Sequence, residues 1–224
     1  MSFITDLFAA SDNPNSLGAK LRNKRQQKFE ELFFSNFSSS DKVRILDVGG
    51  TAYFWKNSAL LQLQNVEIVL LNLTKEEVTL PNITSVSGDA TNMPEFKDQS
   101  FDLVFSNSVI EHLYTWENQV KMANEIMRVG KKYFIQTPNK YFPIEAHYAI
   151  PFAQFAPKSL IFQVLTKTKL SRMQKWEAEN ARQYLDEILL LDEKGMKKLF
   201  PKASLYKEKM LGLTKSFSAH NLNE

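Results

Sequence analysis

The sequence predicts an α/β fold built on a doubly wound, mostly parallel sheet. Short runs of β-branched and aliphatic residues alternate along the chain with segments of helical periodicity, a pattern typical of parallel strands joined by helices. The first run, residues 43–48, ends directly at Gly49 and Gly50. A strand that turns at glycine into a helix can hold a nucleotide-like ligand at the carboxyl edge of such a sheet.

The composition of the 224-residue chain fits one large domain with a substantial core. The chain is 43% hydrophobic and 12% aromatic, which excludes a chain that is disordered throughout. Its net charge of +3 comes without a basic block interleaved with aromatics, so we expect no nucleic-acid partner. Neither a secretory signal nor a run of 18 apolar residues is present, so we expect a cytoplasmic protein without a transmembrane segment. Peripheral membrane contact and the oligomeric state stay open.

The residue types also limit the chemistry. The chain has no cysteine, which excludes disulfides, thiolate catalysis and cysteine-bound zinc. Its three histidines, His112, His147 and His220, lie far apart in the sequence. We therefore expect no histidine-rich metal site and assign no metal ligands.

Residues 1–40 are expected to form an N-terminal helical extension. Residues 1–15 look like a loose lead-in with a turn, and Ser16 is placed to cap a helix that runs to about Phe37. Five basic residues cluster on this helix. We favour a solvated helix face for them, the alternative being that they cover a ligand site or touch an anionic surface. The five are Lys20, Arg22, Lys24, Arg25 and Lys28.

The central part of the chain supplies five predicted strands. They cover residues 43–48, 66–72, 83–86, 101–105 and 132–136. Continuous apolar runs of this length are typical of strands buried on both faces. Helices are predicted over residues 52–63 and 116–127.

Residues 140–190 are expected to form an insertion that acts as a lid or binds the acceptor of a reaction. Its first part, residues 140–170, is rich in aromatic residues and proline. Long excursions of this kind in compact domains are usually functional. Phe152 and Phe155 fit the hydrophobic core and a substrate wall equally well.

The last third of the chain is expected to contain three helices and two strands. Pro157 is placed at the first position of one helix, Ser171 opens another, and Asp192 caps a short third helix. Residues 203–207 and 211–217 look like two final strands. Because a parallel crossover needs a dozen or more residues, strands this close favour antiparallel pairing.

Four short motifs at predicted strand ends resemble those of the class I S-adenosylmethionine-dependent methyltransferases, most closely the type 11 group. The motifs are Asp47-Val48-Gly49-Gly50, Asn72, Gly88-Asp89-Ala90, and Phe101-Asp102-Leu103-Val104 followed by Ser106 to Leu113. The resemblance implies a methyltransferase domain over residues 41–224. It also implies a Rossmann-like sheet of seven strands in the order 3-2-1-4-5-7-6, the last one antiparallel, with helices on both faces.

The resemblance further implies S-adenosyl-L-methionine as cofactor and S-adenosyl-L-homocysteine as product. The cofactor-binding residues that it implies are Asp47, Gly49, Gly50, Thr51, Asn72, Leu73, Asp89, Ala90, Ser106, Asn107 and His112. Asp47 would hold the ammonium end of the cofactor or order the loop around it, and Asp89 would accept from the adenine amine. The chain departs from the family pattern where Thr51 and Tyr53 replace glycines and Asn72 replaces an acid.

For several side chains the sequence allows both a functional and a structural role. His147 is the first candidate for a general base and His112 the second, with packing or cofactor contact as alternatives. Ser108 and Glu111 fit a capping box as well as a functional pair. The aromatic residues that follow Thr51 fit either the core or a contact beside the sulfonium, whose charge an aromatic face attracts. They are Tyr53, Phe54 and Trp55.

The predicted activity is methyl transfer to an oxygen or nitrogen of a small acceptor. Hydrophobic, glycan and natural-product acceptors all fit the aromatic insertion. The alternative is a methyltransferase-like module that binds the cofactor without turnover. A nicotinamide-dependent oxidoreductase is disfavoured because the loop after the first strand lacks the Gly-x-Gly-x-x-Gly pattern.

Overall fold

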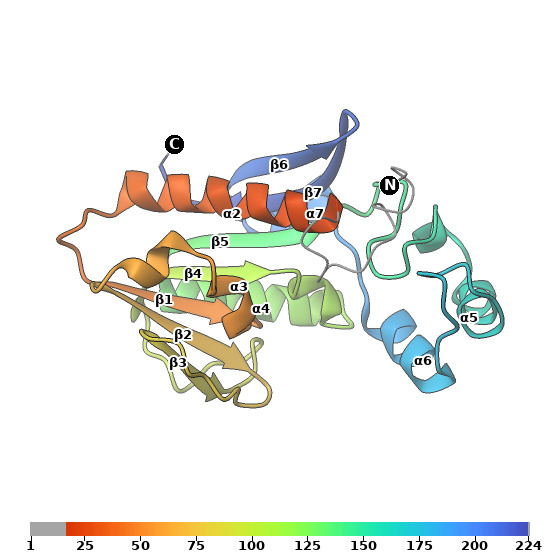
Figure 1. The fold of residues 1–224 in the computed structure, drawn as a ribbon, viewed down its shortest axis with the longest axis horizontal. Coiled ribbons are helices and arrows are strands. Elements are labelled where there is room, and N and C mark those ends of the chain that lie inside the picture. The colour runs from red at the N-terminus through yellow and green to blue at the C-terminus, as the bar shows by residue number, and fades with distance from the viewer. Residues whose placement is uncertain (1–16, 224) are drawn as a thin grey trace.

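The fold is organised around one sheet of seven strands in the order β3-β2-β1-β4-β5-β7-β6 (Figure 1). In this computed structural model, which describes residues 17–223, strands β1 to β5 run parallel. Strand β7 is antiparallel to both β5 and β6. The strand order and the antiparallel final pair are those predicted from the sequence.

The strands lie within a few residues of their predicted positions. They are β1 (Val43–Val48), β2 (Val66–Asn72), β3 (Ile83–Ser87), β4 (Phe101–Asn107), β5 (Gly130–Pro138), β6 (Ser204–Met210) and β7 (Leu213–His220). The helices are α2 (Leu17–Asn36), α3 (Ala52–Trp55), α4 (Trp116–Val129), α5 (Lys158–Lys167), α6 (Ala178–Glu187) and α7 (Glu193–Leu199). Three short 3-10 turns are η1 (Ala59–Gln62), η2 (Ile110–His112) and η3 (Ala153–Phe155). The predicted lead-in and the Ser16 cap lie outside the described residues.

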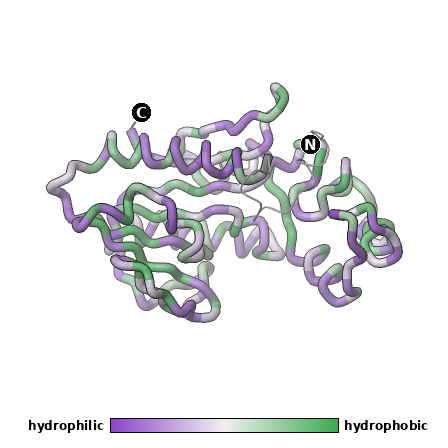
Figure 2. The backbone as a smooth tube through the Cα atoms, in the orientation of Figure 1, coloured by the Kyte–Doolittle hydropathy of each residue, from purple (hydrophilic) through white to green (hydrophobic). Residues whose placement is uncertain are grey.

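Each face of the sheet has its own hydrophobic core. Helices α4 and α7 pack on one face, where Met122 and Ile126 meet Leu46 of β1. Helices α2 and α3 pack on the other, where the ring of Phe29 lies 4.7 Å from that of Phe105. Because both faces are covered, β1 and β4 are buried along most of their length, and hydrophobic stretches run through the sheet (Figure 2). No helix within residues 17–223 is long and apolar enough to cross a membrane.

The helix predicted over residues 52–63 is wrong as a single element. It is divided into α3 and η1. Ser58 lies at the break, and its side chain accepts a hydrogen bond from the backbone N–H of Leu60. Such local side-chain bonds offer the backbone an alternative to a continuous helix.

The helix predicted from Ser171 is also wrong. Ser171 is buried, and its hydroxyl donates to the carbonyl of Tyr148 while it accepts from the indole of Trp176. The next helix, α6, begins only at Ala178. Pro157 occupies the capping position of α5 rather than its first helical position. Asp192 caps α7 as predicted, because its carboxylate accepts from the N–H of Gly195.

Residues 140–190 contain a small helical lobe beside the sheet, with α5 and α6 on its outer side (Figure 1). The lobe has an apolar cluster of its own, in which Ile161 and Leu165 of α5 face Leu185 of α6. The expectation that Phe152 and Phe155 belong to the hydrophobic core is wrong, because they are 59% and 52% exposed, whereas a place in a substrate wall stays a prediction.

Candidate functional site

A cavity of about 420 Å³ opens at the carboxyl ends of β1 and β4. Its walls come from four parts of the chain. They are the strand ends and glycine loop (Asp47, Gly49, Gly50, Asn107), helix α2 (Arg22, Arg25), the start of the lobe (Phe142, Glu145) and the β6–β7 hairpin (Met210, Lys215). The volume lies within the usual range of small-molecule sites. The position is where open α/β sheets bind their ligands.

The loop after β1 requires both of its glycines. Gly49 has a φ of +74°, and a Cβ added there would lie 2.4 Å from Cγ2 of Val109. A Cβ on Gly50 would lie 1.7 Å from Oδ2 of Asp47. Neither position has room for a side chain, so the backbone of this loop directly faces the cavity. Thr51, the next residue, is exposed and also lines the cavity.

Asp47 is a buried carboxylate that uses only one of its two oxygens in a hydrogen bond with the described residues. Its Oδ2 accepts from the indole Nε1 of Trp55 at 2.7 Å, whereas its Oδ1 has no hydrogen-bond partner among the described residues. Burial raises the pKa of Asp47 to about 7, against the opposing effect of the Trp55 bond, and the charge of Glu76 adds to the rise. A buried acceptor without a partner at a cavity wall suits a cationic or hydrogen-donating ligand group.

The other predicted cofactor residues lie in two different places. Asn107 lines the cavity, as Asp47 and the glycine loop do. Asn72 and Leu73 lie outside this cavity at the end of β2, where the amide of Asn72 donates to the carbonyl of Gly50 at 2.8 Å. Asp89 is exposed beyond the end of β3, followed by the half-buried Ala90.

Two of these residues have bonds that sequence reasoning did not anticipate. Oδ1 of Asp89 accepts from both the backbone N–H and the hydroxyl of Thr91. The hydroxyl of Ser106 is buried and donates to the carbonyl of Val48 at 2.9 Å. Ser106 therefore ties β4 to β1 rather than facing the cavity.

The aromatic residues after Thr51 divide between cavity and core. Tyr53 and Phe54 line the cavity, and Tyr53 is 63% exposed. Trp55 is fully buried and holds Asp47. Only the first two are therefore available to a ligand.

The preferred interpretation of the basic helix as a solvated face is wrong for two of its residues. Arg22 and Arg25 line the cavity, and Arg25 is buried. Its guanidinium donates to Oδ1 of Asn107 at 2.5 Å and to Oε1 of Glu208 at 3.0 Å. The signal was present in the sequence, because Arg25 lies four residues from both Leu21 and Phe29. That spacing places it on the buried stripe of the helix.

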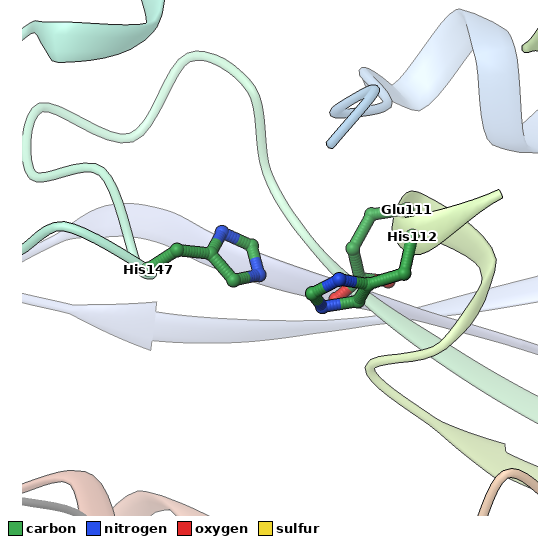
Figure 3. Close-up of side chains that lie close together, drawn as sticks. All are labelled: Glu111, His112 and His147. Carbon is green, nitrogen blue, oxygen red and sulfur yellow. The ribbon is translucent and has the colours of Figure 1, made fainter. Parts of the chain in front are cut away.

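A second group of polar residues gathers where the sheet meets the lobe. His112 lies in η2, directly after β4 and Glu111, and His147 lies in the lobe. Their ring centroids are 4.8 Å apart at an interplanar angle of 86°. Figure 3 shows the two imidazoles pointing toward each other with Glu111 behind His112. One potential ligand atom from each of the three residues lies within 4.8 Å of the other two.

Each histidine is held by a carboxylate through its Nδ1 atom. Nδ1 of His112 is 2.8 Å from Glu187, and Nδ1 of His147 is 2.6 Å from Glu145. Burial lowers the pKa of His147, but the bond and charge of Glu145 and the charge of Glu111 outweigh it, so the pKa is raised overall. A carboxylate at Nδ1 fixes that nitrogen as the donor and leaves Nε2 available.

Glu111 is fully buried, and burial is the main reason that its pKa is raised. Its Oε2 accepts from the hydroxyl of Thr137 at 2.9 Å, and its Oε1 has no hydrogen-bond partner within residues 17–223. The capping box suggested for Ser108 and Glu111 does not form. Ser108 has a φ of 58° and donates instead to the side chain of Gln136.

Comparison with known proteins finds similarity to methyltransferases over part of the chain. Residues 46–133 match a family profile described as a methyltransferase domain. An uncharacterised protein of Mycobacterium tuberculosis, Rv1509, is 34% identical over 68 residues, which are 30% of this chain and only 22% of that protein. This chain therefore spans less than a quarter of the length of the curated relative.

Solved structures share the fold at low sequence identity. The CurJ carbon methyltransferase is 10% identical with a TM-score of 0.56, and the match covers 100% of this chain and 62% of that one. A Nostoc punctiforme protein described as an O-methyltransferase is also 10% identical, with a TM-score of 0.51 and coverage of 94% and 61%. These two matches support the architecture and say nothing about the acceptor.

Proposed function

We propose that this chain, whose residues 46–133 match a methyltransferase-domain profile, moves a methyl group from S-adenosylmethionine to a small acceptor. The cavity at the ends of β1 and β4 carries the proposal. There Oδ1 of Asp47, which accepts no hydrogen bond from residues 17–223, and the bare backbone of Gly49 and Gly50 face one space. A buried acceptor oxygen beside open backbone fits the ammonium and carboxylate end of the cofactor.

The remaining cofactor residues would hold the nucleoside along the exposed edge of the sheet. Asn72 lies at the end of β2, where its side-chain oxygen can accept from a ribose hydroxyl. Leu73 is 83% exposed and offers an apolar surface there. We place the adenine amine at Oδ2 of Asp89, because Thr91 occupies Oδ1, and the ring at the N–H of Ala90. Ser106 would act through the bond that holds β4 against β1.

Bound S-adenosylmethionine supplies an activated methyl group on a sulfonium, and the chain supplies position and proton removal. Holding both reactants in one cavity replaces a bimolecular encounter. An acceptor hydroxyl or protonated amine must lose its proton, and His147 is our first choice of base, with His112 second. Glu145 lines the cavity and binds His147. The base therefore lies next to the space that an acceptor would occupy.

We propose that residues 140–190 form the acceptor-binding lid of a methyltransferase domain over residues 41–224, with residues 1–40 as an extension. Phe142 and Ile144 of this segment line the cavity beside Glu145, so it presents both apolar and acidic surface to an acceptor. Hydrogen exchange measured with and without S-adenosylmethionine tests the lid. We expect slower exchange in residues 140–190 when cofactor is present, and an unchanged rate would remove the lid from the proposal.

Isothermal titration with S-adenosylmethionine and S-adenosylhomocysteine tests the function, with NAD as the control ligand. We expect binding of the first two with one site per chain and no binding of NAD. Failure of both to bind folded protein would contradict the proposal. Binding without transfer across a broad acceptor panel would instead favour the inactive cofactor-binding module.

A further inference from the structure

We propose that Glu111, His112 and His147 together bind a divalent transition-metal ion where the sheet meets the lobe. Two imidazoles and one carboxylate form a ligand set that divalent first-row metals, zinc and manganese among them, accept in proteins. Three protein ligands leave at least one coordination position open. The sequence argued against such a site because its histidines are far apart, and the fold brings two of the three together.

The geometry needs only a small adjustment. The potential ligand atoms lie within 4.8 Å of one another, and ligands on a tetrahedral zinc ion are about 3.3 Å apart. A shift of the three side chains toward one another, with the Nδ1 bonds kept, would bring them to that spacing. His112 and His147 keep 28% and 11% of their side chains exposed, so an ion has a route to the site from solvent.

The surroundings of the two histidines are those of metal ligands. Glu187 and Glu145 hold the Nδ1 atoms at 2.8 Å and 2.6 Å. This second layer of carboxylates fixes the ring orientation, increases ligand basicity and directs the Nε2 lone pairs toward the metal. Oε1 of Glu111 adds an independent observation, because it is buried without a hydrogen-bond partner among the described residues.

The charge of the cluster also favours a cation. Glu111, Glu145 and Glu187 are only 0%, 2% and 8% exposed, and burying three carboxylates together is costly unless positive charge is near. The guanidinium of Arg172 lies close but donates to the carbonyls of Ala146 and His147 rather than to a carboxylate.

A metal ion at this place would deepen the proposed function. Glu145 both holds His147 and lines the cavity, so an ion with an open position is next to the acceptor space. A divalent ion held there would lower the pKa of a coordinated acceptor hydroxyl. His147 and His112 would then promote proton loss as ligands of the ion, in place of acting as the general bases proposed above. This role rests on the proposed methyl transfer, whereas the metal site itself does not.

Titration of the full chain after chelator treatment tests the site, with Zn²⁺ and Mn²⁺ as separate probes in the calorimeter. We expect one ion of either metal to bind per chain. The double variant His112→Ala/His147→Ala should lose binding, and Glu111→Gln should weaken it at least tenfold. Glu117→Gln serves as the matched control, because Glu117 is an exposed carboxylate on α4 and its loss should change nothing. Circular dichroism confirms that each variant is folded.

A second measurement needs no variant. Bound Zn²⁺ should protect His112 and His147 of the wild-type chain from diethyl pyrocarbonate, as read by peptide mass spectrometry. Absence of metal binding to folded wild-type protein, unchanged binding in the double variant, or modification that Zn²⁺ does not slow would each overturn the site. S-adenosylmethionine binding is titrated on the same samples. Its loss with metal binding intact counts against the proposed function alone, and the reverse result counts against the metal site alone.

Discussion

The glycine loop after β1 and the histidine cluster beside the lobe both contain a buried carboxylate. In the loop its partner is near in the sequence, whereas the cluster is formed by residues that are far apart. Each holds a buried carboxylate with one oxygen that has no hydrogen-bond partner in the part of the chain that the structure describes, Asp47 in the loop and Glu111 in the cluster. The loop is local, since Trp55 holds Asp47 from eight positions away. The cluster is assembled over long separations, with His112 and Glu187 lying 75 positions apart. A local device is visible in the sequence, whereas an assembled one appears only once the chain is folded.

Replacing Gly50 with alanine should give the largest difference between the two regions, because it should affect the glycine loop and leave the histidine cluster unchanged. The new Cβ would lie 1.7 Å from Oδ2 of Asp47, so the loop must move. We expect S-adenosylmethionine binding to fall below detection and stability to drop by about 1–3 kcal/mol, with metal binding unchanged. Calorimetry and urea unfolding measure the effects.

Gly212→Ala is the control for this substitution. Gly212 lies in the β6–β7 turn with a positive φ, +81°, and a Cβ there meets no atom of the described residues within 4 Å. The Gly212→Ala substitution should cost about 1 kcal/mol of stability, because a side chain is disfavoured at positive φ, without affecting the cofactor. If Gly50→Ala binds S-adenosylmethionine as the wild type does, the loop is not the cofactor site.

Glu187→Gln should affect the other region alone. Glu187 holds His112 and does not line the cavity. We expect a loss of metal affinity of about 10–100-fold, the usual effect of removing a carboxylate behind a ligating histidine, with cofactor affinity unchanged. Asp186→Asn is the matched control, because Asp186 is the exposed neighbour of Glu187 on the same helix. Equal losses in the two variants would show that general negative charge, and not this bond, is responsible.

Asp47→Asn should remove a pH dependence from cofactor binding. The carboxyl pKa of about 7 means that Asp47 gains its charge between pH 6 and pH 8, so wild-type affinity should rise across that range. The variant should bind about tenfold more weakly at pH 8, or about 1.4 kcal/mol, and the difference should shrink toward pH 6. The cofactor titrates identically in both experiments, so the difference isolates Asp47.

Asp47→Asn should also remove a pH dependence from stability. Its direction is opposite to that of cofactor affinity, because the stability of the wild type falls as the pH rises. The folded pKa of Asp47 lies above its ordinary value of 3.8. The group therefore contributes stability at low pH that is lost as the pH rises through about 7. The melting temperature of the wild type should therefore fall, relative to that of Asp47→Asn, as the pH rises from 4 to 7. Parallel curves for the two proteins would contradict the raised pKa.

Trp176→Ala should loosen the lobe with the smallest effect on the sheet. Its ring lies 5.9 Å from that of Tyr148 and 5.3 Å from that of Tyr184. We expect faster hydrogen exchange over residues 140–190 and unchanged exchange in β1 to β5. Met173→Ala, at a residue that is 82% exposed, should leave both rates as they are. Faster exchange throughout the sheet would mean that the lobe and the sheet unfold together.

The strands of the sheet could be predicted from the sequence because buried strands are continuous apolar runs. It also placed Asp47 and Asn107 correctly at one edge, since parallel strands end on the same side. It missed the division of the helix at Ser58, because a single hydroxyl bond to a neighbouring N–H decides it. It missed the role of Arg25. The charge of this residue suggested an exposed position, although its spacing from Leu21 and Phe29 places it on the buried side of the helix.

The histidine pair lay beyond the reach of the sequence for a different reason. His147 is carried in an irregular segment between β5 and η3, where no periodicity predicts direction. Its place beside His112 depends on how the lobe packs and on the bonds of Glu145 to the backbone of His147 and Tyr148. Contacts of that kind are set by tertiary structure and leave no local pattern.

The bond between Arg25 and Glu208 has a consequence for how the chain matures on the ribosome. The two residues lie 183 positions apart, one on the first described helix and the other on the β6–β7 hairpin. Helix α2 is therefore made long before the carboxylate that neutralises its buried arginine. The wall of the cavity stays incomplete until the final hairpin has left the exit tunnel, so a nascent chain carries the motif region well before it can close a ligand site.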